Sequence, residues 1–224
     1  MNIQDNLKNV KDRIKNSALK VNRNPEEIKL IAVTKTFDVD TIKKAFNLGI
    51  TSIGETKVQE TKEKQKKLGD IAKKIEWHMI GFLQSNKAKD AAEIFDYIHS
   101  IDRMKVARKV SERCLQLNKK MPILIQVNIS GITHGVKPEE TVNFVNELRN
   151  LKGIEVQGLM TIAPLVDDPE EIRPHFRRLK ELASTVGVKH LSMGMSNDFH
   201  IAIEEGATMV RVGSAIFGSR LEGD

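Results

Sequence analysis

The chain has 224 residues and a net charge of +6 at neutral pH, and only 4% of its residues are aromatic. So few aromatic side chains offer little stacking surface for single-stranded nucleic acid, and no nucleic-acid motif is present. No apolar run approaches the about 18 residues needed to span a bilayer, the N-terminus lacks a signal-peptide core, and the one cysteine cannot form an internal disulfide, so we expect a cytoplasmic protein without membrane contacts.

The predicted elements alternate between helix and strand. Apolar residues at helical spacing predict an amphipathic helix over residues 3–21, within an N-terminal segment, 1–22, that we expect to pack on the rest of the fold. Residues 30–36 form a short apolar run, rich in β-branched side chains, which predicts a buried strand that ends in Lys35. Further strands are predicted at 50–55, 75–81, 95–101, 122–128, 154–161, 188–193 and 208–212. Helices are predicted between them, and Asp102 is expected to cap one of these.

Eight strands that alternate with helices predict a parallel sheet, and eight is the number that closes a single (β/α)8 TIM-type barrel. The additional N-terminal helix precedes the first strand. An open doubly wound sheet is the alternative. No linker-like segment divides the chain, so we expect one domain over residues 1–224. The charged run 62–67 is interpreted as a solvated helix face.

Polar residues at the carboxyl ends of barrel strands are brought together at one mouth. Lys35 is the first candidate, because burial favours a neutral, nucleophilic amine, although a lysine that reaches into water is the ordinary alternative. His78 either lines the site or is a core histidine. The predicted strand ends carry Lys35, Glu55, Thr56, His78, Asn128, Met160, Thr161, Ser196, Arg211 and Gly213. Each of these residues alone could also be an ordinary loop residue. The histidines show no metal-ligand spacing, and no metal site is expected.

The loops after strands seven and eight predict an anion site. Both contain glycine and serine, and barrels often bind phosphate there through backbone N–H groups. Ser196, Gly213 and Ser214 are the candidate phosphate ligands, although small residues in tight turns are an alternative. A phosphate site facing Lys35 suggests an aldehyde-bearing phosphate ester held as a Schiff base, and pyridoxal 5′-phosphate (PLP) fits this description. Arg211 could reach either the phosphate or the ring nitrogen.

Long segments of the chain resemble the pyridoxal phosphate homeostasis proteins. They are AVTK at 32–35, GE at 54–55, VQE at 58–60, WHMIG at 77–81, LQSNK at 83–87, GLMTI at 158–162, LSMGMS at 191–196 and MVRVGSAIFG at 209–218. The resemblance implies the barrel of alanine racemase, PLP on Lys35, and phosphate contacts from Ser196, Gly213 and Ser214. It also implies that Arg211 bonds the pyridine nitrogen. Thr56 and His134 stand where the family usually has Asn and Lys.

The resemblance implies a PLP-binding protein of vitamin B6 and amino-acid homeostasis without established turnover, with PLP-dependent apoenzymes as possible acceptors. We expect it to be a monomer. The alternative is a PLP-dependent amino-acid racemase of single-domain type. Racemisation needs an acid or base on each face of the substrate carbanion, and with the sequence ending at Asp224 we do not expect the domain that supplies the second group in alanine racemase. A third possibility is a barrel that binds another phosphate ester without covalent chemistry.

Overall fold

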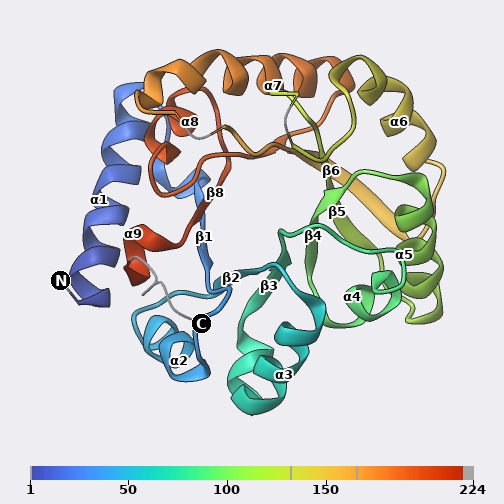
Figure 1. Ribbon diagram of the computed structural model, residues 1–224, viewed down its shortest axis with the longest axis horizontal. Helices are drawn as coiled ribbons and strands as arrows, with labels where there is room; N and C mark the ends of the chain where they lie inside the picture. Colours follow the sequence, from blue (N-terminus) through green and yellow to red (C-terminus); the bar gives the residue numbers. More distant parts are fainter. Residues whose placement is uncertain (1, 132, 165, 219–224) are drawn as a thin grey trace.

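The computed structural model describes residues 2–131, 133–164 and 166–218, and its centre is a closed barrel of eight parallel strands (Figure 1). Each strand pairs with its neighbours in chain order. The last strand pairs with the first, with Lys29 opposite Met209 and Ala32 opposite Val212, so the sheet has no open edge. The predicted barrel is confirmed, and the open-sheet alternative is wrong. The strands are β1 (Lys29–Val33), β2 (Ser52–Glu55), β3 (Glu76–Met79), β4 (Tyr97–Ile101), β5 (Met121–Gln126), β6 (Ile154–Met160), β7 (His190–Ser192) and β8 (Met209–Val212).

Helices surround the barrel (Figure 1). They are α1 (Ile3–Lys20), α2 (Val39–Asn47), α3 (Val58–Leu68), α4 (Ala88–Ile94), α5 (Met104–Gln116), α6 (Thr141–Leu148), α7 (Arg173–Val186), α8 (Phe199–Glu204) and α9 (Ser214–Phe217). Short 3-10 helices are η1 (Pro25–Glu27), η2 (Gly69–Lys74), η3 (Pro138–Glu140) and η4 (Pro169–Ile172). No described helix is both long and apolar enough to cross a membrane.

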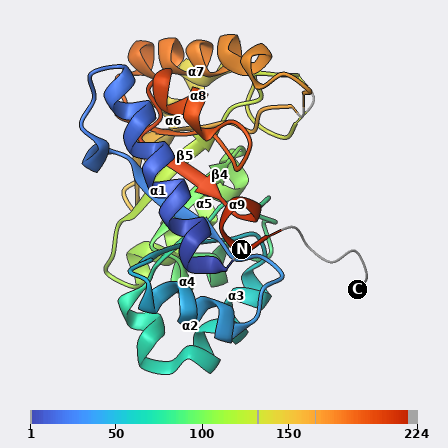
Figure 2. The ribbon, with the colours of Figure 1, turned by 90° about the vertical axis from the view of Figure 1, so that its left-hand side faces the viewer.

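The N-terminal helix α1 lies across one side of the barrel, beside α8 and α9 (Figure 2). Asn2 caps it by accepting a hydrogen bond from the backbone N–H of Asp5. Its predicted apolar face is confirmed, since Leu7, Val10 and Ile14 are buried.

One local prediction was wrong, and another holds for most of its residues but not all. Asp102 does not cap α5, whose N-cap position is held by Arg103 without a side-chain hydrogen bond. The Asp102 side chain is buried instead, and its Oδ1 has no partner among the described residues. The charged run 62–67 is solvated as predicted at Lys62, Glu63, Lys66 and Lys67. Lys64 differs: it is only 6% exposed, because it forms ion pairs with Glu55 and Glu60.

The core has two parts. The larger cluster fills the space between strands and helices, and a smaller one, Ile31, Leu124, Met160 and Met209, lies inside the barrel. The barrel interior also holds polar side chains, so it is only partly filled by the layers of apolar side chains that are usual in this architecture.

Candidate functional site

A cavity of about 940 Å³ opens at the carboxyl ends of the strands. Six predicted site residues line it: Lys35, Thr56, Ser196, Arg211, Gly213 and Ser214. They come from opposite ends of the sequence and meet because β8 closes the barrel against β1. The structure therefore brings the candidate nucleophile and the candidate phosphate ligands into one site.

Lys35 stands in a tight turn just after β1. Its neighbour Thr36 has a φ of +71°, a left-handed conformation that is costly for a β-branched residue. The backbone N–H of Thr36 donates to Glu60 Oε1 at 2.9 Å, and the carbonyl of Thr34 accepts from Lys64 Nζ at 2.8 Å. Helix α3 therefore fixes the residues on both sides of Lys35.

The centre of this contact is a buried ion cluster. Lys64 Nζ lies 2.8 Å from Glu55 Oε1 and 2.6 Å from Glu60 Oε1, and Glu55 also accepts from the Thr34 hydroxyl at 2.6 Å. The Glu55 side chain is fully buried, and its Oε2 has no partner among the described residues. Burial raises the pKa of Glu55, and the Lys64 ammonium opposes that rise.

Arg211, on β8, is held rigidly below the cavity mouth. Its Nη1 donates to the carbonyl and the hydroxyl of Ser192, both at 2.7 Å, and its Nη2 donates to the carbonyl of Thr161 at 2.8 Å. Burial lowers the pKa of Arg211 to about 10, which leaves the guanidinium charged at neutral pH. Because an arginine has five N–H donors in a fixed plane, these contacts leave further donors for a ligand.

Ser196 follows β7 and faces the N-terminus of α9. Its Oγ accepts from the backbone N–H of Gly213 at 3.3 Å and of Ala215 at 3.2 Å. Gly194, just before it, has a φ of +92°, and an added Cβ would lie 2.6 Å from Ala202 Cβ. Glycine is therefore required for the turn that carries Ser196 to α9.

His78 and Met160, which were also expected at the site, do not line the cavity. Both are buried one interior layer lower. Side chains alternate between the two faces of a strand, so the next interior position is two residues further along. Those positions, Ile80 and Ile162, do line the cavity.

The sequence reasoning missed several lining residues. Asp198 is 5% exposed, accepts a hydrogen bond from the backbone N–H of Met195, and has its pKa raised by burial. Gln126, at the end of β5, donates to the carbonyl of His134 at 2.7 Å. Gln126 lies two residues before the predicted strand end at Asn128, and only this position could have indicated that it lines the cavity. Among the described residues, no group of three His, Cys, Asp or Glu side chains could hold a metal ion.

The rim of the cavity carries an aromatic pair. The rings of Phe82 and His134 lie 4.9 Å apart, and the Arg103 guanidinium stacks 4.3 Å from the Phe82 ring centroid. His134, one of the two positions at which the chain differs from the resembled family, is also part of the cavity wall.

Comparison with known proteins identifies related chains. The family described as alanine racemase, N-terminal domain, matches residues 2–221. A pyridoxal phosphate homeostasis protein of Aquifex aeolicus is 39% identical over 228 residues, which cover 98% of this chain and 99% of the relative.

Solved structures agree with this relationship. PipY of Synechococcus elongatus with PLP bound has a TM-score of 0.82 and 34% identity, covering 93% of this chain and 100% of PipY. An alanine racemase of Clostridium difficile has a TM-score of 0.74 at 20% identity, covering 100% of this chain and 60% of the racemase. The racemase shows a shared fold alone.

Proposed function

The chain belongs to the alanine racemase N-terminal domain family and, within it, to the pyridoxal phosphate homeostasis proteins, and from this premise we propose that it binds PLP on Lys35 and takes part in PLP and amino-acid homeostasis. The observation that carries the proposal is that Lys35 lines the same cavity as Ser196, Gly213 and Ser214. The cavity thus offers an amine for an aldehyde and hydrogen-bond donors for a phosphate.

The described residues fit this cofactor. A cavity of about 940 Å³ is large enough for a drug-sized ligand. An added Cβ at Gly213 would lie 3.3 Å from the Val33 carbonyl oxygen, which is a tight contact, so glycine gives the most room at this edge of the cavity. The Ser196 hydroxyl accepts through its oxygen and keeps its hydrogen to donate to an anion.

Each residue has a distinct role in the proposal. PLP supplies an aldehyde that condenses with the Lys35 amine and releases water. The hydroxyls of Ser196 and Ser214 donate to the phosphate beside Gly213, while the backbone N–H groups of Gly213 and Ala215 hold the Ser196 oxygen and so orient its hydroxyl. Thr56 lines the wall beside Lys35. We place His78 and Met160 below the cofactor, as support rather than ligands.

Arg211 is proposed to meet the ring nitrogen rather than the phosphate. It lies on β8, two residues before Gly213, which directly follows the strand, so it is one interior layer below the phosphate ligands. Arginine donates and does not release its proton, so it favours an unprotonated ring nitrogen, which withdraws electrons weakly. Such a contact would hold the cofactor without making its ring a strong electron sink.

The proposal extends to partners. Relatives matched over nearly their whole length bear the name of homeostasis proteins, which favours this function over the racemase alternative. We propose PLP-dependent apoenzymes as acceptors, a monomeric state and a cytoplasmic location. The support for the location is the single cysteine, Cys114, which suits a reducing compartment.

The test is direct chemical mapping. The purified protein is incubated with PLP, reduced with borohydride, digested and analysed by mass spectrometry. We expect the adduct on Lys35, and its absence there would refute the proposal. Lys29 also lies on β1, but at the opposite end of the strand from Lys35, where it is paired with Glu76. The variant Lys29→Met is therefore the matched control.

Ser196→Ala tests the phosphate contacts. Loss of one donor to a charged group should weaken PLP binding about tenfold, measured by titration of the visible absorption band. Unchanged affinity would remove Ser196 from the phosphate site. Ser184→Ala, on α7 and away from the cavity, is the control.

A further inference from the structure

A chain of buried hydrogen bonds connects Arg211 to the opposite end of the barrel. Ser192 Oγ, which accepts from Arg211, lies 2.9 Å from His99 Nδ1. His99 Nε2 lies 3.0 Å from His78 Nδ1, and His78 Nε2 lies 2.6 Å from Glu76 Oε1. We call Ser192, His99, His78 and Glu76 the interior relay.

The members of the interior relay come from β7, β4 and β3 and cross the inside of the barrel. Ser192, His99 and His78 are each 0% exposed. Glu76 stands at the start of β3 with its side chain 34% exposed, and Lys29 Nζ lies 2.6 Å from its Oε1. The relay therefore joins the floor of the cavity to a partly solvated ion pair at the far end.

The two ends fix the direction of every hydrogen bond. Arg211 can only donate, and the Glu76 carboxylate can only accept. With both imidazoles neutral, His78 must carry its hydrogen on Nε2 to donate to Glu76, so its Nδ1 accepts from His99. His99 then carries its hydrogen on Nε2, and its Nδ1 accepts from the Ser192 hydroxyl. One tautomer of each ring satisfies all the links.

We propose that the interior relay is a positioning device for Arg211, which orients the guanidinium toward the cavity and links it to the Glu76 carboxylate through one fixed order of donors. Such a chain has a physical use. Hydrogen bonds that point in one direction polarise one another, so the Ser192 hydroxyl becomes a better acceptor for Arg211 when it donates to His99. Three polar groups in a barrel interior are costly unless fully paired, and the relay pairs them.

The consequence for the site rests on the proposed function. If Arg211 bonds the ring nitrogen of PLP, the relay sets the position and donor strength of that contact from outside the cavity. Ser192, His99, His78 and Glu76 do not line the cavity. They would therefore change cofactor affinity and spectrum without touching the cofactor.

The first experiment needs no cofactor. Long-range 1H–15N NMR of the purified protein at neutral pH reports which imidazole nitrogen bears hydrogen. We expect both His78 and His99 as neutral rings with hydrogen on Nε2. Hydrogen on Nδ1 of either ring, or a charged imidazolium, would overturn the fixed order. The histidine signals are assigned with single His→Gln variants.

The second experiment interrupts the relay at each end. Ser192→Ala removes the link next to Arg211. Glu76→Gln replaces a carboxylate that can only accept with a neutral amide of the same shape that can accept or donate, so the far end no longer fixes the order of donors. We expect a changed 15N pattern at His99 in both, and PLP affinity about fivefold weaker in Ser192→Ala. Glu155→Gln, an exposed carboxylate at the start of β6, should leave both measurements unchanged.

The outcomes separate the two proposals. If both relay variants match the wild type in the His99 signals and in PLP affinity, the relay is refuted while PLP binding stands. If wild-type protein gives no Lys35 adduct, the proposed function fails, and the NMR measurement alone decides on the order of donors. Glu76→Gln keeps the test valid should Ser192→Ala fail to fold, since Glu76 lies at the partly exposed end.

Discussion

At the scale of single residues, Thr36 shows how the site is held in a costly conformation. Its φ of +71° strains a β-branched residue by about 1–2 kcal/mol or more. Thr36→Gly removes the strain but adds chain entropy to the unfolded state, worth about 0.5–1 kcal/mol. The backbone bond to Glu60 is retained. We therefore expect the free energy of unfolding in urea to rise by about 1 kcal/mol.

Asn118 provides the matched control for this prediction. Its φ is +51°, just after the end of α5, but asparagine tolerates this conformation far better than threonine. Asn118→Gly should change the free energy of unfolding by no more than about 0.5 kcal/mol. A loss of stability in Thr36→Gly would show that its side chain contributes more than its backbone strain costs.

The same scale shows what the sequence could predict about the site. Lys35, Arg211 and Gly213 were predictable because each stands at a strand end, where barrel topology gathers side chains. The side chains of His78 and Met160 also point into the barrel, but how deep they lie depends on how the strands are staggered around it. That stagger cannot be derived from a residue's position at a predicted strand end. Interior positions two residues further along reach the cavity instead.

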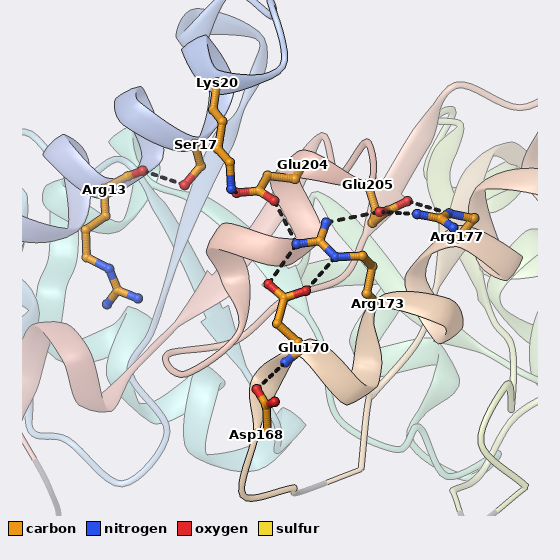
Figure 3. A network of polar contacts seen from close by, with 9 residues as sticks. All are labelled: Arg13, Ser17, Lys20, Asp168, Glu170, Arg173, Arg177, Glu204 and Glu205. Atoms are coloured by element: carbon orange, nitrogen blue, oxygen red, sulfur yellow. Dashed lines mark hydrogen bonds and ion pairs between the residues drawn. The ribbon is translucent and has the colours of Figure 1, made fainter.

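At the scale of elements, α1, α7 and α8 are joined by one ionic network (Figure 3). Arg173, at the start of α7, binds Glu170 through two hydrogen bonds, Glu204 at 2.8 Å and Glu205 at 3.1 Å. Lys20 of α1 also binds Glu204 at 2.8 Å. The Glu204 and Glu205 side chains are only 9% and 10% exposed, so both carboxylates depend on these cations.

Arg173→Met should be costly for this reason. It leaves two nearly buried carboxylates with fewer partners, and we expect a loss of about 2–3 kcal/mol in the free energy of unfolding in urea. Lys20→Met removes a cation that is 66% exposed, so the loss should be below about 1 kcal/mol. Equal losses in the two variants would contradict this account.

The elements themselves were largely predictable, because apolar runs and helical periodicity are local signals. All eight strands and the N-terminal helix were found. What failed depended on tertiary pairing. The burial of Lys64 needs Glu55 from β2 and the carbonyl of Thr34, and a charged run cannot show which of its members meets them. Asp102 has the residue type of a helix cap, but its side chain is buried and Arg103 takes that position.

At the scale of the whole molecule, the polar interior makes stability depend on pH. Burial lowers the pKa of His78 and that of His99, so both stay neutral in the folded protein where the unfolded chain becomes charged. The hydrogen bond from His78, with the ion pair to Lys29, lowers the pKa of Glu76 to about 2. The unfolded chain then binds more protons than the folded one, so stability falls as the pH is lowered.

The contribution of Glu76 begins to be lost at a lower pH than that of the histidines, because unfolded histidines take up protons before unfolded glutamates do. An unfolded glutamate takes up its proton near pH 4.5, and the folded one near 2, so the stability it provides is complete above 4.5 and is lost between these values. The full shift would be worth about 3 kcal/mol, and because the side chain is about one-third exposed we expect about 1–2 kcal/mol. Urea unfolding at pH 5 and 2.5 should therefore show a smaller loss for Glu76→Gln than for wild type. Glu155→Gln should lose as much as wild type, and an identical loss in all three proteins would show that Glu76 does not couple proton uptake to folding.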